Sequence, residues 1–419
     1  MNQLQNLYLN DMDMSSSKKR SVCFVITSFI HYSRNILVLD ELRKRSDVEL
    51  HVVLAGTALS AKYTSVSIGI KERLAKAGFE YLHEMHFNLE GDNYATKTKT
   101  TGLGIIEFSS LLEQIKPDVV VIRGDRFEVL SAAVAAALMN ISIAHIEGGD
   151  LSGTIDESVR HAVSKLSHIH FATNNDAANR LQKMGENPKY IFNFGSPDLE
   201  VPAKLGMHAP DITVTGSGAS LDLSQEYIIV LYHPVASEFD DSISHTKTVL
   251  DAVHDLGVQT VWFWPNFDVG SEQISRQLRI FNDQVQNHKI RFMRYLHPEE
   301  WFGLLRNAKA LVGNSSAGIK ECSFLGVPVV NIGTRQQQRL RGPNVVDVPH
   351  DSSAIKNVIR QQILHGKYQS SSLYLGESPS KNIAYKIATV SLYTQKIFYE
   401  KEEHAVSEKI WKTAKNIVS

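Results

Sequence analysis

The sequence predicts an α/β protein with two Rossmann-like domains that face each other across a cleft. Short apolar, β-branched runs alternate with longer segments of helical periodicity, which is typical of βαβ units and of parallel sheets with right-handed crossovers. The chain is 419 residues long. That length exceeds one ordinary core and indicates two domains of roughly 200 residues each.

Eight apolar runs are the expected strands, four before a Gly/Ser/Thr-rich segment at 211–224 and four after it. They are 22–27, 48–54, 119–122, 141–146, 227–231, 258–264, 310–312 and 327–332. The clearest helical patterns between them are 127–138, 157–166 and 176–183. The segment 211–224 breaks this alternation, so we expect the inter-domain linker there.

The alternation also predicts the domain boundaries. We expect a flexible leader at 1–19, an N-terminal Rossmann-like domain at 20–205 and a C-terminal Rossmann-like domain at 206–380. The last stretch, 381–419, reads as amphipathic helices with no following strand. We expect these helices to pack back on the N-terminal domain.

Composition narrows the class of protein. A net charge of -1 offers no basic field for nucleic acid. Only Cys23 and Cys322 are present, which suits a reducing cytoplasm. No apolar run approaches the roughly 20 residues of a membrane span. No His/Cys/Asp spacing matches a metal site. We therefore expect a soluble, cytoplasmic protein with no metal and no cofactor.

Acidic residues follow two of the expected strands in the first domain. The strand at 141–146 runs into Glu147, a Gly-Gly pair and then Asp156, and the strand at 119–122 delivers Asp125 to the same edge. Ligands of open α/β sheets bind outside the carboxyl ends of the strands, where such groups can transfer protons. Asp125 and Asp156 could instead cap helices. A carboxylate at the buried strand end, Glu147, is costly unless it is paired or used.

The second domain shows a pattern suited to a nucleotide diphosphate. Small residues and hydroxyls follow the strand at 310–312, and an Arg follows the next strand; the candidates are Ser315, Ser316, Gly318, Glu321 and Arg335. Backbone N–H groups and hydroxyls at the start of a helix bind phosphate, a carboxylate can accept from ribose hydroxyls, and a guanidinium suits the diphosphate. A Gly/Ser turn before a helix is also common as a purely structural feature.

The same residues carry a family resemblance. The chain resembles the hydrolysing UDP-N-acetylglucosamine 2-epimerases, including the bacterial enzymes of sialic and legionaminic acid synthesis. The matching motifs span both domains and are GDRFE at 124–128, HIEGGD at 145–150, IDESVRH at 155–161, FGSPDLE at 194–200, His233-Pro234, GNSSAGIKE at 313–321 and NIGTRQ at 331–336. The resemblance implies a glycosyltransferase-B type fold, UDP in the cleft and a homodimer or homotetramer.

In that family a UDP-2-acetamido sugar loses UDP by anti elimination, and water adds to the resulting glycal to release the free manno-configured sugar. By motif, the resemblance assigns the catalytic carboxylates to Asp125, Glu147 and Asp156 and the catalytic histidine to His233. It places Ser315, Ser316, Gly318, Glu321 and Arg335 on the nucleotide. Ser33 and Arg126 match positions near the sugar or uridine.

One departure concerns the segment after the first strand, 28–34. Phe29 stands where the family usually has an Arg, and Arg34 takes the place of a following Lys. A more apolar sugar, such as a 6-deoxy 2,4-diacetamido sugar, would account for Phe29.

Two alternatives remain open at this point. A non-hydrolysing 2-epimerase typically carries a GHR-like triplet where Tyr232-His233-Pro234 stands and an AGLR-like run where Gly148-Gly149-Asp150 stands, so the local sequence favours hydrolysis. The other alternative is a glycosyltransferase-like or inactive UDP-sugar-binding protein.

Overall fold

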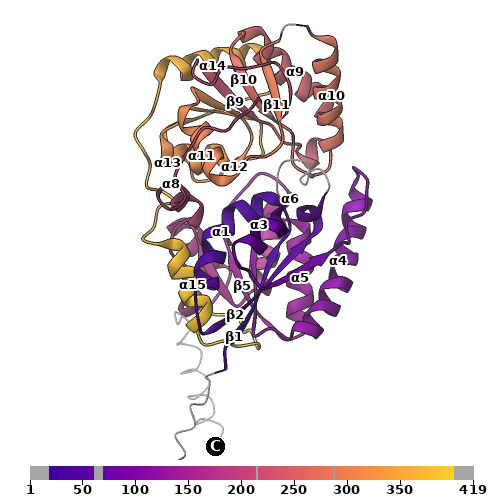
Figure 1. The fold of residues 1–419 in the computed structure, drawn as a ribbon, viewed down its shortest axis with the longest axis vertical. Coiled ribbons are helices and arrows are strands. Elements are labelled where there is room, and N and C mark those ends of the chain that lie inside the picture. Colours follow the sequence, from indigo (N-terminus) through magenta and orange to yellow (C-terminus); the bar gives the residue numbers. More distant parts are fainter. Residues whose placement is uncertain (1–17, 61–68, 214–215, 287, 401–419) are drawn as a thin grey trace, which may run out of the picture.

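The computed structural model describes residues 18–60, 69–213, 216–286 and 288–400. They form two α/β lobes stacked along the long axis of the molecule, with the N-terminal lobe below and the C-terminal lobe above in the view of Figure 1. Each lobe is built on a sheet of seven strands. The predicted fold class is confirmed.

The sheet of the first lobe has the strand order β3-β2-β1-β4-β5-β6-β7, and all neighbouring strands are parallel. Its strands are β1 (Arg20–Ile26), β2 (Val48–Ala55), β3 (Tyr81–Met85), β4 (Val119–Arg123), β5 (Ser142–Ile146), β6 (Ile169–Ala172) and β7 (Ile191–Asn193). The strand order reverses between β1 and β4, although both strands run parallel, and open parallel sheets bind ligands at such a switch point.

Helices cover both faces of this sheet (Figure 1). They are α1 (Phe29–Arg43), α3 (Ile70–Lys76), α4 (Tyr94–Ile115), α5 (Phe127–Leu138), α6 (Ile155–Leu166), α7 (Asn175–Lys183) and the short α8 (Val201–Lys204), with 3₁₀ turns η1 (Gly56–Leu59), η2 (Pro188–Tyr190) and η3 (Pro197–Glu200). The Ala-rich α5 lies against α4 and α6 and buries Val129, Ala132 and Ala133 completely.

The second lobe repeats the plan. Its order is β14-β13-β12-β9-β10-β11-β8, parallel except for β8, which pairs antiparallel to β11. The strands are β8 (Ser217–Gly218), β9 (Tyr227–Leu231), β10 (Gln259–Phe263), β11 (Ile290–Met293), β12 (Ala310–Gly313), β13 (Val329–Ile332) and β14 (Val345–Val348). Its helices are η4 (Ala236–Glu238), α9 (Ser242–Leu256), α10 (Ser271–Gln284), α11 (Pro298–Asn307), α12 (Ser316–Ile319), α13 (Glu321–Leu325) and α14 (Ser352–His365).

All eight expected strands are present, and the other six strands escaped prediction because they are short or half polar. β3 reads YLHEM with only Met85 buried, and β8 is two residues long. β8 lies inside the segment expected to be a linker, 211–224, so part of that segment belongs to the second sheet.

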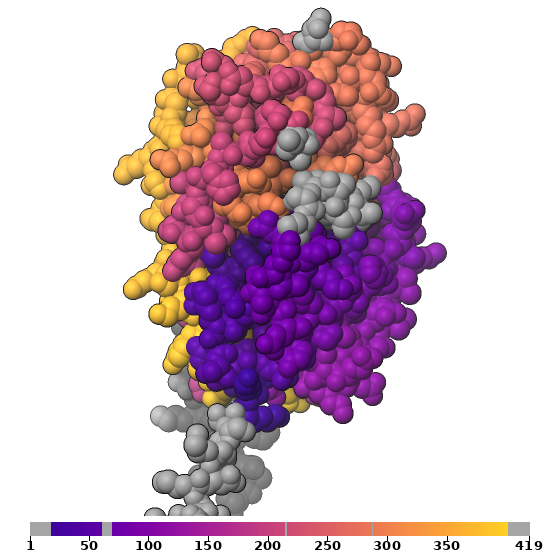
Figure 2. Space-filling model, in the orientation of Figure 1, coloured from indigo at the N-terminus to yellow at the C-terminus, as the bar shows by residue number. Residues whose placement is uncertain are grey.

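The chain returns to the first lobe after α14. It runs down the side of both lobes to α15 (Pro379–Thr389), which lies against α1 (Figures 1 and 2). Ile383 and Ile387 of α15 are buried in the same hydrophobic cluster as Phe24 and Val38. Residues 390–400 are not helical. The leader up to residue 17 and the expected helical region 401–419 lie outside the described residues.

Within the described part of the chain, no helix is long and apolar enough to cross a membrane.

Candidate active site

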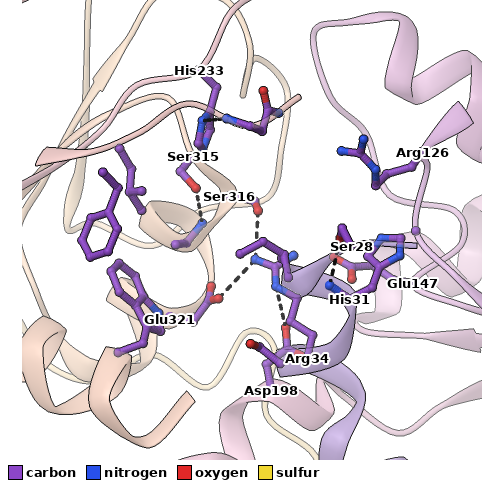
Figure 3. Close-up of a pocket in the computed structure, with 18 of the residues that line it drawn as sticks. Ser28, His31, Arg34, Arg126, Glu147, Asp198, His233, Ser315, Ser316 and Glu321 are labelled. Carbon is purple, nitrogen blue, oxygen red and sulfur yellow. Dashed lines mark hydrogen bonds and ion pairs between the residues drawn. The ribbon is translucent and has the colours of Figure 1, made fainter. Parts of the chain in front are cut away.

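A cavity of about 230 Å³ lies between the lobes, at the carboxyl ends of the strands of both sheets. Figure 3 shows His233, Ser315, Ser316 and Glu321 of the second lobe facing His31, Arg126 and Glu147 of the first. Of the residues predicted from sequence, the cavity is lined by Ser33, Asp125, Arg126, Glu147, Asp156, His233, Ser315, Ser316, Glu321 and Arg335. The two sheets therefore bring together residues that the chain carries far apart.

Gly318 does not line the cavity, contrary to its predicted contact with the nucleotide. It faces the sheet, where a Cβ would lie 2.9 Å from Val329 Cγ1 and 3.3 Å from Leu311 Cδ2. A larger residue would push α12 off the sheet, so Gly318 has a packing role. Lys320 separates the four-residue α12 from α13.

Asp156 is the carboxyl group best suited to exchange a proton. It follows Thr154, whose side chain caps α6, so Asp156 itself is not the cap. Burial and the neighbouring carboxylates Asp268 and Asp125 raise the pKa of Asp156 to about 6. A pKa near neutrality lets one group both accept and return a proton under physiological conditions.

Arg335 of the second lobe reaches Asp156 of the first. Its Nη2 lies 3.5 Å from Asp156 Oδ2 and 3.5 Å from Asp268 Oδ2. The backbone supports this contact, because the Gly153 N–H donates to the Arg335 carbonyl at 3.1 Å. A Cβ on Gly153 would lie 2.0 Å from the Thr334 carbonyl oxygen, so only glycine permits this approach of the lobes.

Asp125 also lines the cavity and accepts a short hydrogen bond from Arg160 of α6. Burial alone would raise the pKa of Asp125, but Arg160, together with Arg339 and Arg335, lowers it. The N-cap of α5 is Arg126, so Asp125 is not the cap either. Asp125 is therefore an ionised carboxylate next to the less acidic Asp156.

Glu147 sits at the end of β5 with φ +70°, a left-handed conformation that is uncommon for a residue other than glycine. It is ion-paired to Arg123, Lys320 and Arg339. Burial would raise the pKa of Glu147, but the charges of Lys320, Arg123, Arg34 and Arg339 together hold it well below its usual value. Glu147 is thus a fixed anion rather than a group poised to take up a proton.

Glu147 belongs to a buried network of charges that joins the lobes, here called the interlobe cluster. Four cations and four carboxylates alternate in it, and each side chain is at most 18% exposed. The members are Arg34, Arg123, Glu147, Asp150 and Asp198 from the first lobe and Lys320, Glu321 and Arg339 from the second. The cluster forms the floor of the cavity and is electrically balanced.

His233 follows β9 and presents a neutral imidazole to the cavity. Its Nδ1 accepts from the Asn266 backbone N–H at 3.3 Å, so Nε2 carries the proton. Burial and the nearby Arg335 lower the pKa of His233 to about 3. Asn314 holds the His233 backbone with two hydrogen bonds of 2.8 Å each. The ring is a rigidly placed hydrogen-bond donor.

Some polar atoms of the residues predicted to bind the substrate have no hydrogen-bond partner in the described part of the chain and are available to a ligand. Arg34 Nη2 donates to Ser316 Oγ at 3.1 Å and pairs with Glu321 Oε1 at 3.2 Å (Figure 3). Glu321 Oε2 and Ser33 Oγ are buried and have no hydrogen-bond partner among the described residues. Buried polar atoms are normally satisfied, so both point to a ligand that completes them.

Sequence reasoning missed Arg160, Arg339, Lys320 and Trp264, all of which lie at or below the cavity. Arg160 lies within the motif at 155–161 and Lys320 within the motif at 313–321, and membership of a motif is the only sequence feature that pointed to a role for either residue. The Arg339 pairing with Asp150 and Glu147 joins residues of different lobes.

Phe29 does not occupy the position that the sequence suggested. Its ring is 7% exposed and packs against Tyr32, Tyr295 and His297 rather than lining the cavity. The first-lobe cations that line the cavity are Arg34, Arg123, Arg126 and Arg160. Phe29 therefore gives no support for a more apolar sugar.

Two Rossmann-like lobes that enclose a cavity at their strand ends define a protein of the glycosyltransferase-B type. The chain belongs to the UDP-N-acetylglucosamine 2-epimerase family, whose model matches residues 40–388. The predicted family resemblance is thereby confirmed, and the chain is an enzyme of this family.

Two curated relatives and one solved structure illustrate the similarity. The chain is 31% identical over 377 residues to the UDP-N,N'-diacetylbacillosamine 2-epimerase (hydrolyzing) of Legionella pneumophila, covering 90% of this chain and 97% of the relative. It is 32% identical over 339 residues to the UDP-N-acetylglucosamine 2-epimerase of Neisseria meningitidis serogroup B, covering 81% and 86%. The fold matches the S. aureus MnaA-UDP co-structure with a TM-score of 0.69 at 13% identity, covering 91% of this chain and 100% of the other.

Proposed function

We propose that this enzyme is a hydrolysing UDP-sugar 2-epimerase. It would convert a UDP-2-acetamido sugar into UDP and the free manno-configured sugar, a precursor for a nonulosonic acid. The contact between Asp156 and Arg335 carries the proposal. Elimination breaks the C2–H and C1–O bonds of adjacent carbons, so the base and the cation that receives the leaving phosphate must lie within a few ångströms of each other.

Asp156 is the base that the electrostatics favour. In the elimination, its carboxylate takes the C2 proton, the C–H electrons form the C1–C2 double bond, and the C1–O electrons leave with UDP. The cavity enforces the raised pKa through burial and nearby carboxylates, which strengthens the group as a base. Glu147 is a weaker candidate, since the interlobe cluster already neutralises it.

Hydration then reverses the proton transfer on the other face of the sugar. A water molecule adds its oxygen to C1 while its proton passes to Asp125. The electrons of the C1–C2 double bond form a bond from C2 to a solvent-derived proton on the face opposite Asp156, which gives the manno configuration, and Asp156 releases its own proton to solvent. Asp125 lies beside Asp156 and is ionised, so it suits activation of that water. Arg160 holds its carboxylate in place.

Residues of the second lobe would stabilise the UDP that leaves. Arg335 supplies a guanidinium, His233 an Nε2–H donor, and Ser315 and Ser316 hydroxyls at the same wall. Donors placed in advance at the departing phosphate stabilise its developing charge. Glu321 Oε2 is free to accept from a ribose hydroxyl.

The names of the two relatives suggest two candidate UDP-sugar substrates for this enzyme. The Legionella relative is named as a hydrolyzing 2-epimerase of UDP-N,N'-diacetylbacillosamine, and the Neisseria relative as a 2-epimerase of UDP-N-acetylglucosamine. Both sugars carry the 2-acetamido group that the chemistry needs. We include homodimeric or homotetrameric assembly in the proposal, and sedimentation velocity measures it.

The test is ³¹P and ¹H NMR of the enzyme with each sugar nucleotide in D₂O. We expect free UDP and a free manno-sugar that carries deuterium at C2, and the faster reaction identifies the substrate. An epimerised sugar still attached to UDP would identify a non-hydrolysing epimerase instead. UDP-sugar binding without turnover would identify an inactive binding protein. Substitutions of Asp125 and Asp156 should severely slow this reaction. Asp176 is an exposed carboxyl on α7, so Asp176→Asn is the control and should react like the wild type.

A further inference from the structure

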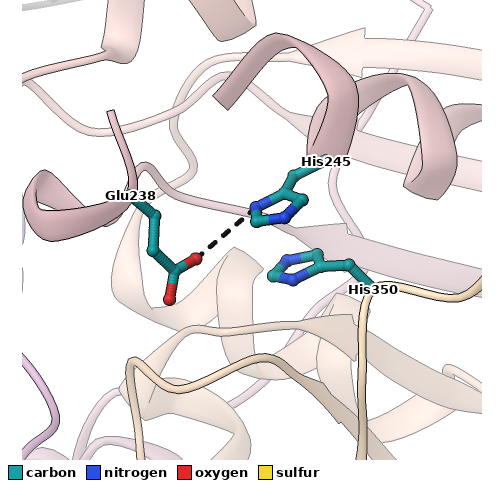
Figure 4. Close-up of side chains that lie close together, drawn as sticks. All are labelled: Glu238, His245 and His350. Carbon is teal, nitrogen blue, oxygen red and sulfur yellow. Dashed lines mark ion pairs between the residues drawn. The ribbon is translucent and has the colours of Figure 1, made fainter. Parts of the chain in front are cut away.

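A second group of ligand-type side chains lies in the upper lobe, outside the cavity. Glu238 of η4, His245 of α9 and His350, which follows β14, converge from three segments of the chain (Figure 4). One ligand atom from each can be chosen so that all three lie within 4.8 Å of one another. All three side chains are half-buried.

Hydrogen bonds from neighbouring residues that are not candidate ligands orient two of these side chains. The Tyr232 hydroxyl lies 2.8 Å from His350 Nε2, which leaves His350 Nδ1 for another partner. The Thr334 hydroxyl donates to Glu238 Oε1 at 2.6 Å, which leaves Oε2 toward His245, 3.5 Å from its Nδ1. Such outer-shell bonds to one atom of a ligand are characteristic of metal sites, because they fix the orientation of the other atom.

The two imidazoles are stacked, with ring centroids 3.7 Å apart and planes 4° from parallel. A metal ion would bind each imidazole through the lone pair of one neutral ring nitrogen. Because the lone pairs of parallel rings do not converge, one ring must turn about its Cβ–Cγ bond for both rings to bind one ion beside Glu238.

We propose that Glu238, His245 and His350 bind one divalent transition-metal ion, with Zn²⁺ as the best match. Two imidazole nitrogens and one carboxylate oxygen are a ligand set that Zn²⁺ accepts at about 2.0–2.2 Å, with water in a fourth position. The site is separate from the proposed epimerase chemistry and does not depend on it. The sequence predicted no metal because the spacing from residue 238 to residue 350 matches no motif.

The site lies next to two chain segments that carry residues of the cavity. Tyr232, which contacts His350, precedes His233 in the chain, and Thr334, which contacts Glu238, precedes Arg335. Gly333 packs on the His350 ring so closely that a Cβ would lie 2.6 Å from Cε1. An ion at this site would therefore brace the two segments that carry His233 and Arg335.

A comparable trio in the first lobe provides a matched control. Glu49 and His83 contact opposite nitrogens of His51, at 3.1 Å each, and the His51 and His83 rings are also stacked. Because His51 uses both of its nitrogens, this trio does not direct three ligand atoms toward one point. It has the same residue types without the convergence.

The experiment uses untagged full-length protein freed of metal with a chelator and dialysed. Zn²⁺ is titrated in competition with a chromophoric chelator, and thermal unfolding is followed with and without Zn²⁺. We expect one Zn²⁺ per chain and a raised Tm. Glu238→Gln, His245→Gln and His350→Gln should each weaken binding by roughly tenfold or more and abolish the Tm shift, whereas His83→Gln should retain both.

Co²⁺ provides a direct view of the ligands. The Co²⁺-loaded protein should show the visible absorption bands of four-coordinate cobalt, and these bands should be lost in His245→Gln. Absence of saturable Zn²⁺ binding to the wild-type protein would overturn the proposal. So would undiminished binding in the three variants, since the ion would then lie elsewhere.

Discussion

Lys320→Met tests the interlobe cluster, in which four cations balance four carboxylates. Lys320 is completely buried and pairs with Glu147 and Asp198 of the other lobe. The variant keeps most of the side-chain volume but leaves three cations facing four carboxylates. Breaking a buried ion pair on one side leaves an uncompensated charge and costs about 3–5 kcal/mol.

The charge balance also predicts how a second substitution acts. Glu147→Gln alone leaves four cations facing three carboxylates, and the double variant Glu147→Gln/Lys320→Met restores three of each. The double variant should therefore lose less free energy of unfolding than the sum of the two single variants. A coupling of about 1–3 kcal/mol is expected for residues in one network.

Urea denaturation measures these free energies, and thermal unfolding gives an independent check. For a chain built of domains near 200 residues, about 3–5 kcal/mol corresponds to a Tm decrease of roughly 6–20 °C. Lys71→Met is the control, because its ion pair with Glu84 is half exposed and should contribute less than about 1 kcal/mol.

A Lys320→Met protein within about 1 kcal/mol of the wild type would refute this reasoning, because the cluster would then tolerate an unbalanced charge. Strict additivity in the double variant would refute the claim that Lys320 and Glu147 act as one network.

Further predictions concern the cavity and the closure of the lobes. Asp156→Asn should lower kcat by about 10²–10⁴-fold while UDP affinity measured by calorimetry stays near that of the wild type; near-native turnover would remove Asp156 from the mechanism. Because the pKa of Asp156 is raised to about 6 and the base must be ionised, kcat/KM should fall as the pH drops through about 6; a rate that stays constant down to pH values near about 4, the usual range for Asp, would contradict this assignment. Arg335→Ala and Ser315→Ala should weaken UDP binding, by roughly tenfold or more for Arg335, since it supplies a charged hydrogen bond; unchanged dissociation constants would place UDP elsewhere. Asp92 accepts from the Gly270 and Glu272 N–H groups of the other lobe at 2.8 Å each, so Asp92→Ala should raise KM more than it lowers kcat; a change confined to kcat would argue against a role in closure.

Local sequence was sufficient for much of the site. β4 and β5 contain apolar runs that indicate buried strands, and the acids that follow neighbouring parallel strands meet at one sheet edge. The same holds for Ser315 and Arg335, which follow neighbouring strands of the second sheet. Gly318 shows the limit of such reasoning, because a small residue before a helix serves packing as readily as ligand binding.

The sequence by itself determined the two-lobed α/β fold, the family and ten residues of the cavity wall, because strand ends and motifs are local features. Only the tertiary structure decided what state those residues are in. Burial together with Asp268 and Asp125 raises the pKa of Asp156, while Glu147 is paired with cations that include Lys320, a residue 173 positions away in the chain. Electrostatic interactions depend on distances through space and on burial, and both arise only when the two lobes close on each other.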